Sequence, residues 1–95
     1  MRLPEFLRFL APRGARSAPV RYAGRDVIEV REGERVVKLY AELQNGPVAR
    51  IIHHGSIRGW EPPHERETFD EAARERCLKA VTDFLDSRGV RYEIV

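Results

Sequence analysis

Nine residues in the middle of the chain alternate between apolar and polar side chains: Arg35-Val36-Val37-Lys38-Leu39-Tyr40-Ala41-Glu42-Leu43. Apolar residues occupy the odd-numbered positions from 37 to 43, whereas Lys38, Tyr40 and Glu42 fall between them. Successive side chains of a β-strand point to opposite faces of its sheet. The pattern therefore predicts a long strand with one buried face and one mainly polar face.

Candidate strands lie on both sides of this segment. Residues 26–31 precede it across Glu32-Gly33, and residues 48–54 follow it across Asn45-Gly46. Such Gly-containing pairs favour the turns of β-hairpins, because glycine and asparagine tolerate positive φ. We expect a three-stranded antiparallel meander, with residues 20–22 as a further short candidate strand before it.

A long helix is predicted after the meander. Thr68 and Glu71 fit a capping box at its start, and Gly89 suits the left-handed residue that ends a helix. Between them apolar residues recur at a helical period and form one stripe, which consists of Phe69, Ala73, Cys77, Leu78, Ala80, Val81, Phe84 and Leu85. Residues 90–95 alternate again and predict a final strand.

These elements predict a small two-layer α+β domain over residues 20–95, in the order β-β-β-α-β. One helix covers only one face of a sheet, so we expect the other face to be polar and open. The side chains predicted for this open face are Lys38, Tyr40, Glu42 and Arg50.

The N-terminal residues 1–19 differ in character from this domain. Apolar residues among the first ten are spaced as in a short helix over residues 4–10, and a linker rich in Pro, Gly, Ala and Ser follows. Residues 1–25 carry six arginines and one glutamate, a net charge of +5. We interpret residues 1–19 as a basic arm, which is either a solvated tail or a contact to nucleic acid, an anionic membrane or an acidic partner.

The composition is that of a small globular protein. The chain has 95 residues, of which 42% are hydrophobic and 34% charged, and this length suffices for one domain. No run reaches the roughly 18 apolar residues that span a bilayer. The single cysteine, Cys77, has no partner for an internal disulfide, so we expect a cytoplasmic protein without membrane association.

No set of residues has the spacing of a catalytic or metal site. His53 and His54 are adjacent in a predicted strand and point to opposite faces, and His64 lies ten residues further on. Cys77 lies on the apolar stripe of the helix, which fits a core residue better than a nucleophile. We therefore expect no catalytic residues, no metal and no cofactor.

The loop over residues 55–67 contains the only tryptophan, Trp60, followed by Glu61-Pro62-Pro63. Tryptophan is large and amphipathic and is enriched in the centres of protein interfaces. Two roles for Trp60 remain open at this point, a lid over the small core and a direct contact to a partner.

The strand of residues 36–43, the Trp60-Glu61-Pro62-Pro63 turn, the helix with acidic residues at its start and the closing strand after Gly89 occur together in this chain. In these features the chain from about residue 20 to 95 resembles the immunity protein 74 family of bacterial polymorphic toxin systems. The resemblance implies a small α+β domain with a characteristic tryptophan, which binds a cognate toxin and inhibits it without catalysis.

With this resemblance we predict an acidic partner-binding patch on the loop, anchored by the tryptophan. Its predicted members are Trp60, Glu61, Pro63, His64, Glu65 and Glu67. Acidic residues near a helix N-terminus are common and account for Asp70 and Glu71, but not for the three glutamates of the loop.

Three other functions remain open at this stage. The arginine-rich arm and the open sheet face are features of a small nucleic-acid-associated domain. His64 with the neighbouring glutamates is the one candidate for acid–base catalysis. A homodimer formed by pairing of residues 90–95 across two sheet edges is a third possibility.

Overall fold

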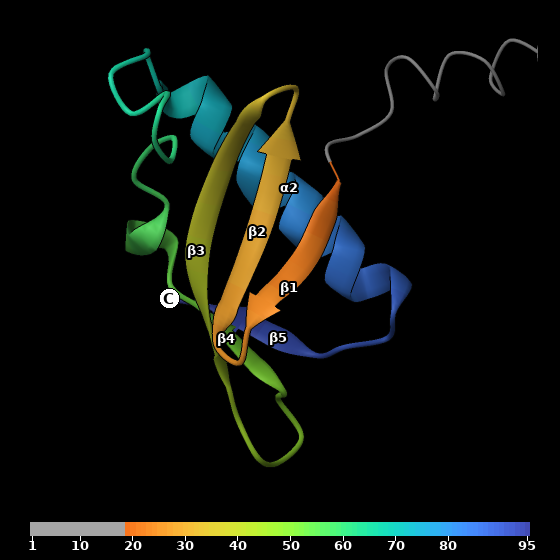
Figure 1. Ribbon diagram of the computed structural model, residues 1–95. Coiled ribbons are helices and arrows are strands. Elements are labelled where there is room, and N and C mark those ends of the chain that lie inside the picture. Colours follow the sequence, from red (N-terminus) through yellow and green to blue (C-terminus); the bar gives the residue numbers. More distant parts are fainter. Residues whose placement is uncertain (1–18) are drawn as a thin grey trace, which may run out of the picture.

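The computed structural model describes residues 19–95, so the helix predicted over residues 4–10 and most of the basic arm lie outside the described residues. The described part is α+β, as predicted (Figure 1). Its elements in chain order are β1 (Val20–Gly24), β2 (Val27–Glu32), β3 (Arg35–Leu43), β4 (Arg50–Ile52), the 3-10 helix η1 (His54–Ser56), α2 (Glu71–Ser87) and β5 (Tyr92–Ile94).

The strands form one five-stranded sheet in the order β1-β2-β3-β4-β5. The first four strands pair antiparallel, and β5 pairs parallel with β4 after the chain has crossed the sheet through α2. The antiparallel meander therefore has four strands, one more than the three predicted. Residues 20–24 form a full strand, because β2 supplies partners for Val20, Arg21, Tyr22 and Gly24.

The strand predicted over residues 48–54 is wrong in length. Only Arg50–Ile52 form β4, and they pair with three residues at the end of β3. Pro47 has no backbone N–H to offer a ladder, and at His54 the chain turns into η1. His53 follows the strand directly, with its backbone N–H donating to the Tyr40 carbonyl at 3.0 Å.

Helix α2 begins two residues later than a cap at Thr68 requires. Asp70 is its N-cap, and the Asp70 carboxylate accepts a hydrogen bond from the backbone N–H of Ala73 at 2.9 Å. The capping box of Thr68 with Glu71 is therefore wrong. The predicted end is confirmed, since Gly89 has a φ of 69° directly after the helix.

The helix lies across one face of the sheet, and the opposite face is not covered by any element of the part described (Figure 1). The core between the two layers is made of side chains from β2, β3, β4, α2 and the loop before the helix. Its buried members are Ile28, Val30, Val37, Leu39, Ala41, Ile52, Ile57, Trp60, Ala73, Cys77, Val81 and Leu85. The alternation seen in the sequence of β3 thus separates a helix-facing side from an uncovered side.

Arg50 lies on the helix side of the sheet and not on the uncovered face as predicted. It has the same strand parity as the buried Ile52. Its guanidinium stacks over the ring of Tyr22 at 4.8 Å and donates to the carbonyl oxygens of Arg25 and Ala41. An arginine can occupy this position because the residue is only half-buried and its guanidinium finds two carbonyl acceptors.

The two possible caps of α2 give a direct test. Replacement of Asp70 by alanine removes the acceptor for the Ala73 amide, and we expect the free energy of unfolding to fall by about 1 kcal/mol. The matched variant Thr68→Ala removes a hydroxyl that makes no hydrogen bond within the described residues, so its effect should stay within about 0.5 kcal/mol. Urea unfolding measures both, and an equal loss in the two variants would contradict the cap assigned here.

Candidate partner-binding site

The loop from η1 to α2 runs along the edge of β3 that β4 does not reach. β4 pairs only with residues 41–43, so the earlier residues of β3 have no strand on that side. The Val36 carbonyl accepts from the backbone N–H of Glu61 at 2.7 Å, and the Tyr40 amide donates to Ser56 Oγ at 2.8 Å. The loop thus replaces a neighbouring strand, and its position is set by hydrogen bonds to the sheet.

Trp60 is buried at the base of this loop. Its ring is 5% exposed, packs edge-to-face on Phe69 with centroids 5.1 Å apart, and donates from Nε1 to the Thr68 carbonyl at 3.0 Å. Of the two roles left open by the sequence, the structure places the ring in the core. A tryptophan with a satisfied N–H in this position ties both ends of the loop together.

Arg35, at the start of β3, connects the loop to the sheet. Its guanidinium lies 5.4 Å from the centre of the Trp60 ring and makes an ion pair with the Glu67 carboxylate at 2.6 Å. His64 Nδ1 lies 2.5 Å from the other oxygen of Glu67. The hydrogen bond from His64 and the positive charge of Arg35 lower the pKa of Glu67.

A shallow cavity of about 360 Å³ opens between this loop and the turn from β2 to β3. Its lining consists of Glu32, Gly33, Glu34, Arg35, His64 and Glu67. Two of the six predicted partner-binding residues, His64 and Glu67, therefore face the cavity together with a turn that the sequence analysis did not select. The left-handed Gly33, with a φ of 66°, lets the turn close tightly beside them.

The loop and the β2–β3 turn together carry both signs of charge. Glu67 is paired with Arg35, and Glu32 makes two hydrogen bonds of 2.9 Å to Arg76 of α2. Among the described residues, Glu34, Glu61 and Glu65 have no ion pair. The negative charge available to a partner thus comes from these three glutamates.

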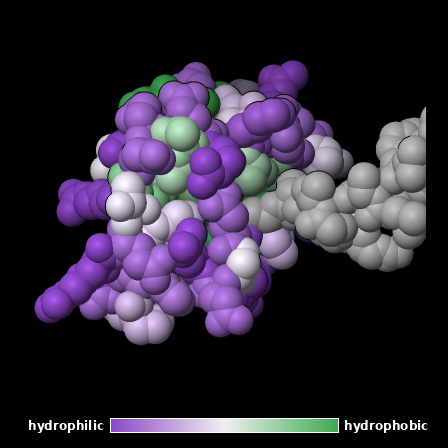
Figure 2. Space-filling view, turned by 90° about the horizontal axis from the view of Figure 1, so that it is seen from above, coloured by the Kyte–Doolittle hydropathy of each residue, from purple (hydrophilic) through white to green (hydrophobic). Residues whose placement is uncertain are grey.

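Pro63 and Glu65 are exposed, and Glu61 and His64 are half-buried. The structure therefore places five of the six predicted residues at or near the surface of the loop, with Trp60 beneath them. Figure 2 views the molecule from the end that carries the loop and the β2–β3 turn, where hydrophilic side chains cover most of the surface.

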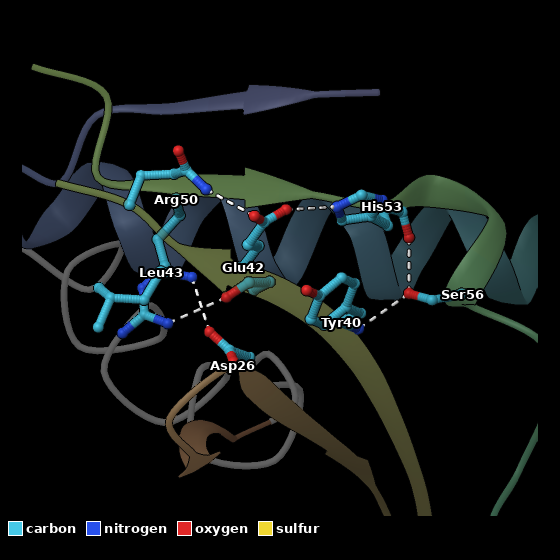
Figure 3. Close-up of polar contacts among 9 residues, drawn as sticks. Asp26, Tyr40, Glu42, Leu43, Arg50, His53 and Ser56 are labelled. Atoms are coloured by element: carbon cyan, nitrogen blue, oxygen red, sulfur yellow. Dashed lines mark hydrogen bonds and ion pairs between the residues drawn. The ribbon is translucent and has the colours of Figure 1, made fainter. Parts of the chain in front are cut away.

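A second polar cluster lies on the uncovered sheet face, where β3 meets β4 (Figure 3). The His53 ring stacks on Tyr40 with centroids 4.5 Å apart, and His53 Nε2 lies 3.1 Å from the Glu42 carboxylate. Ser56 Oγ donates to the His53 carbonyl at 2.6 Å. The alternation of β3 predicted the faces of Tyr40 and Glu42, but their contact with His53 depends on the β3–β4 register, which the turn residues alone did not specify.

The chemistry available in these clusters is limited. Ser56 Oγ contacts two backbone groups and not the His53 ring, so the Ser56 hydroxyl has no side-chain base beside it. Cys77 is 1% exposed, and burial raises the pKa of its thiol to about 11. Over residues 19–95 no three His, Cys, Asp or Glu side chains are grouped as metal ligands, and no helix there has the length and apolarity to cross a membrane.

Comparison with known families gives one match. The model of the family described as Immunity protein 74 matches residues 22–95, which is most of the chain and includes the sheet from the middle of β1 onward, the loop and α2. No match was found to a curated protein or to a solved structure.

The contacts of Glu67 predict a pH dependence of stability. Its pKa is lowered in the folded state, so the carboxylate contributes stability above its unfolded pKa, about 4.3, and this contribution is lost as the pH falls through the folded value. We expect Glu67→Gln to be less stable than the natural protein at pH 7 and the difference to shrink below about pH 4. Thermal unfolding of both proteins across pH 3–7 measures this, and a constant difference would contradict it.

Proposed function

The chain belongs to the immunity protein 74 family, and on this premise we propose that it neutralises a cognate bacterial toxin by binding it directly, without catalysis. The family match over residues 22–95 is the observation that carries the proposal. The toxin belongs to a polymorphic toxin system and is encoded beside its inhibitor, and neutralisation takes place in the cytoplasm of the producing cell.

We place the toxin-binding surface on the loop of residues 60–67 and the adjacent β2–β3 turn. The exposed loop residues and the cavity between the two segments supply a contoured, charged surface. Its contact residues are Glu61, Pro63, His64, Glu65 and Glu67 of the loop, with Glu34 of the turn. Trp60 contributes by holding the loop in place, because its ring is nearly inaccessible to a partner.

The contacts beneath the surface support this assignment. Glu61 is hydrogen-bonded to β3 through its backbone, Trp60 to Thr68, and Glu67 to Arg35 and His64. A loop fixed in this way loses little conformational entropy when a partner binds, which favours tight association.

The charges support a basic partner. Glu34, Glu61 and Glu65 have no ion pair among the described residues, so binding a cationic surface does not require the loss of existing pairs. Toxins that act on nucleic acids present basic active sites, and complementary charge accelerates and orients association with such a site.

The test begins with the gene next to this one. We expect its product to kill cells when expressed alone and to be harmless when this protein is co-expressed. The double variant Glu61→Lys/Glu65→Lys should lose protection and bind the purified toxin at least about tenfold more weakly, because two like charges then meet the partner.

Glu75→Lys is the matched control, since Glu75 is an exposed residue of α2 without an ion pair in the described structure. It makes the same kind of charge reversal, at one position instead of two, away from the loop and should protect cells fully. If the product of the neighbouring gene is harmless when expressed alone, the toxin-inhibitor role is wrong. If the loop variant folds and protects as well as the control, the role can stand but the binding surface lies elsewhere.

A further inference from the structure

The uncovered face of β3 presents a cation, an aromatic ring and an anion in a row. Lys38, Tyr40 and Glu42 are alternate residues of one strand and therefore share a face, about 6.8 Å apart. All three lie on the side of the sheet opposite α2, where no described element covers them (Figure 1).

This order is complementary to its own reverse. Consider two copies whose uncovered faces meet. A twofold axis that lies between the two sheets, above Tyr40 and perpendicular to β3, reverses the direction of β3 in the second copy. Lys38 then faces Glu42 of the other copy, and Tyr40 faces its own equivalent. An axis along the strand would instead place each lysine on a lysine, so the charges favour only the first arrangement.

We propose that this face is a self-association surface, through which two copies of the chain form a twofold dimer with Lys38 of each copy paired to Glu42 of the other. The occupant of the open face is thus a second copy of the same chain. This differs from pairing of the β5 edges, because it uses side chains of the sheet face and not backbone hydrogen bonds. It does not depend on the toxin-binding role.

The middle of the proposed interface is aromatic and apolar. Tyr40 is 40% exposed although its ring stacks on His53. Val27 lies opposite Tyr40 on β2, and Ile51 lies opposite Glu42 on β4. Aromatic side chains near the centre of an interface, surrounded by polar groups, are the usual arrangement of its most strongly contributing residues.

The Lys38 end and the Glu42 end of the uncovered face carry opposite charges. At the Lys38 end, Glu29 is paired with Arg21 at 2.9 Å and lies 3.7 Å from Arg31, which leaves this end with an excess of positive charge. Lys38 itself has no ion pair within residues 19–95.

At the other end Glu42 accepts from Gln44 at 2.7 Å and lies beside His53, and its side chain remains 37% exposed. Glu93 of β5 lies in the same row, two strands away, and adds a second carboxylate. Lys38 of a second copy would therefore meet the Glu42 carboxylate, while Glu93, roughly 10 Å to the side, adds to the negative charge of this end.

The face is large enough for a weak to moderate dimer. Five strands about 4.8 Å apart, with a central strand of nine residues, span an area of several hundred Å². Stable interfaces bury about 800 Å² on each partner. We therefore expect association in the micromolar range.

Sedimentation velocity of the full chain between about 5 and 500 μM tests the proposal. The natural protein should shift from monomer to dimer in this range. Lys38→Glu and Glu42→Lys should each weaken the dimer at least about tenfold, because each creates two like-charge contacts. The double variant Lys38→Glu/Glu42→Lys exchanges the charges and should restore most of the association.

Lys79→Glu, on the outer side of α2, is the control and should leave the dimer unchanged. Circular dichroism and thermal unfolding establish that each variant is folded, and Glu93→Lys replaces Glu42→Lys if the latter is not. A monomer at every concentration overturns the proposal, as does a dimer that Lys38→Glu leaves intact. A double variant no stronger than the single variants also overturns it, since only a Lys38–Glu42 contact predicts the rescue.

Discussion

β3 is longer than the strand that pairs with it on one side, and its backbone groups there still need hydrogen-bond partners. β4 reaches only residues 41–43. Buried or half-buried N–H and C=O groups left without partners would each cost roughly 1–3 kcal/mol. Ser56 supplies an acceptor for the Tyr40 amide, and Glu61 supplies a donor for the Val36 carbonyl. This requirement holds the η1–α2 loop against the sheet.

The same requirement positions the candidate partner-binding site. Once Glu61 is bound to β3, the preceding Trp60 enters the core between the sheet and Phe69. Its Nε1 then reaches the Thr68 carbonyl, which brings the far end of the loop back towards its start. Arg35 lies over the same ring and pairs with Glu67, so the β2–β3 turn and the loop become one surface. A loop rich in glycine and proline is ordered here by its contacts with β3 and not by its own sequence preferences.

The sequence predicted those elements whose pattern is local. The alternation of β3, the apolar stripe of α2 and the glycine after it each follow from a period or a conformational preference within one segment. The length of β4 and the face of Arg50 were not predictable in this way, because both depend on where the neighbouring chain leaves the sheet. The N-cap was mistaken because Thr68 and Asp70 both suit the position. Only the surroundings decide between them, since the Thr68 carbonyl is used by Trp60 and the Asp70 side chain is free to bond the helix.

In the candidate site, too, local features were predictable and features that depend on distant residues were not. The loop glutamates and His64 were recognisable by composition, but the arginine that neutralises Glu67 comes from a residue distant in sequence. Arg35 lies at the start of β3, and no local pattern relates it to Glu67. The burial of Trp60 likewise depends on Phe69 and on the edge of β3. The patch predicted as acidic thus contains ion pairs of its own through Glu67, and its carboxylates without an ion pair among the described residues are those of Glu61 and Glu65.

The alternation along β3 also determines how the two proposed surfaces relate. Arg35 has the odd parity of the core residues and therefore reaches Trp60 and Glu67 on the loop side. Lys38, Tyr40 and Glu42 have even parity and point to the uncovered face. Since one strand directs the two sets to opposite faces of the sheet, the proposed self-association surface and the proposed toxin-binding surface use different side chains of β3.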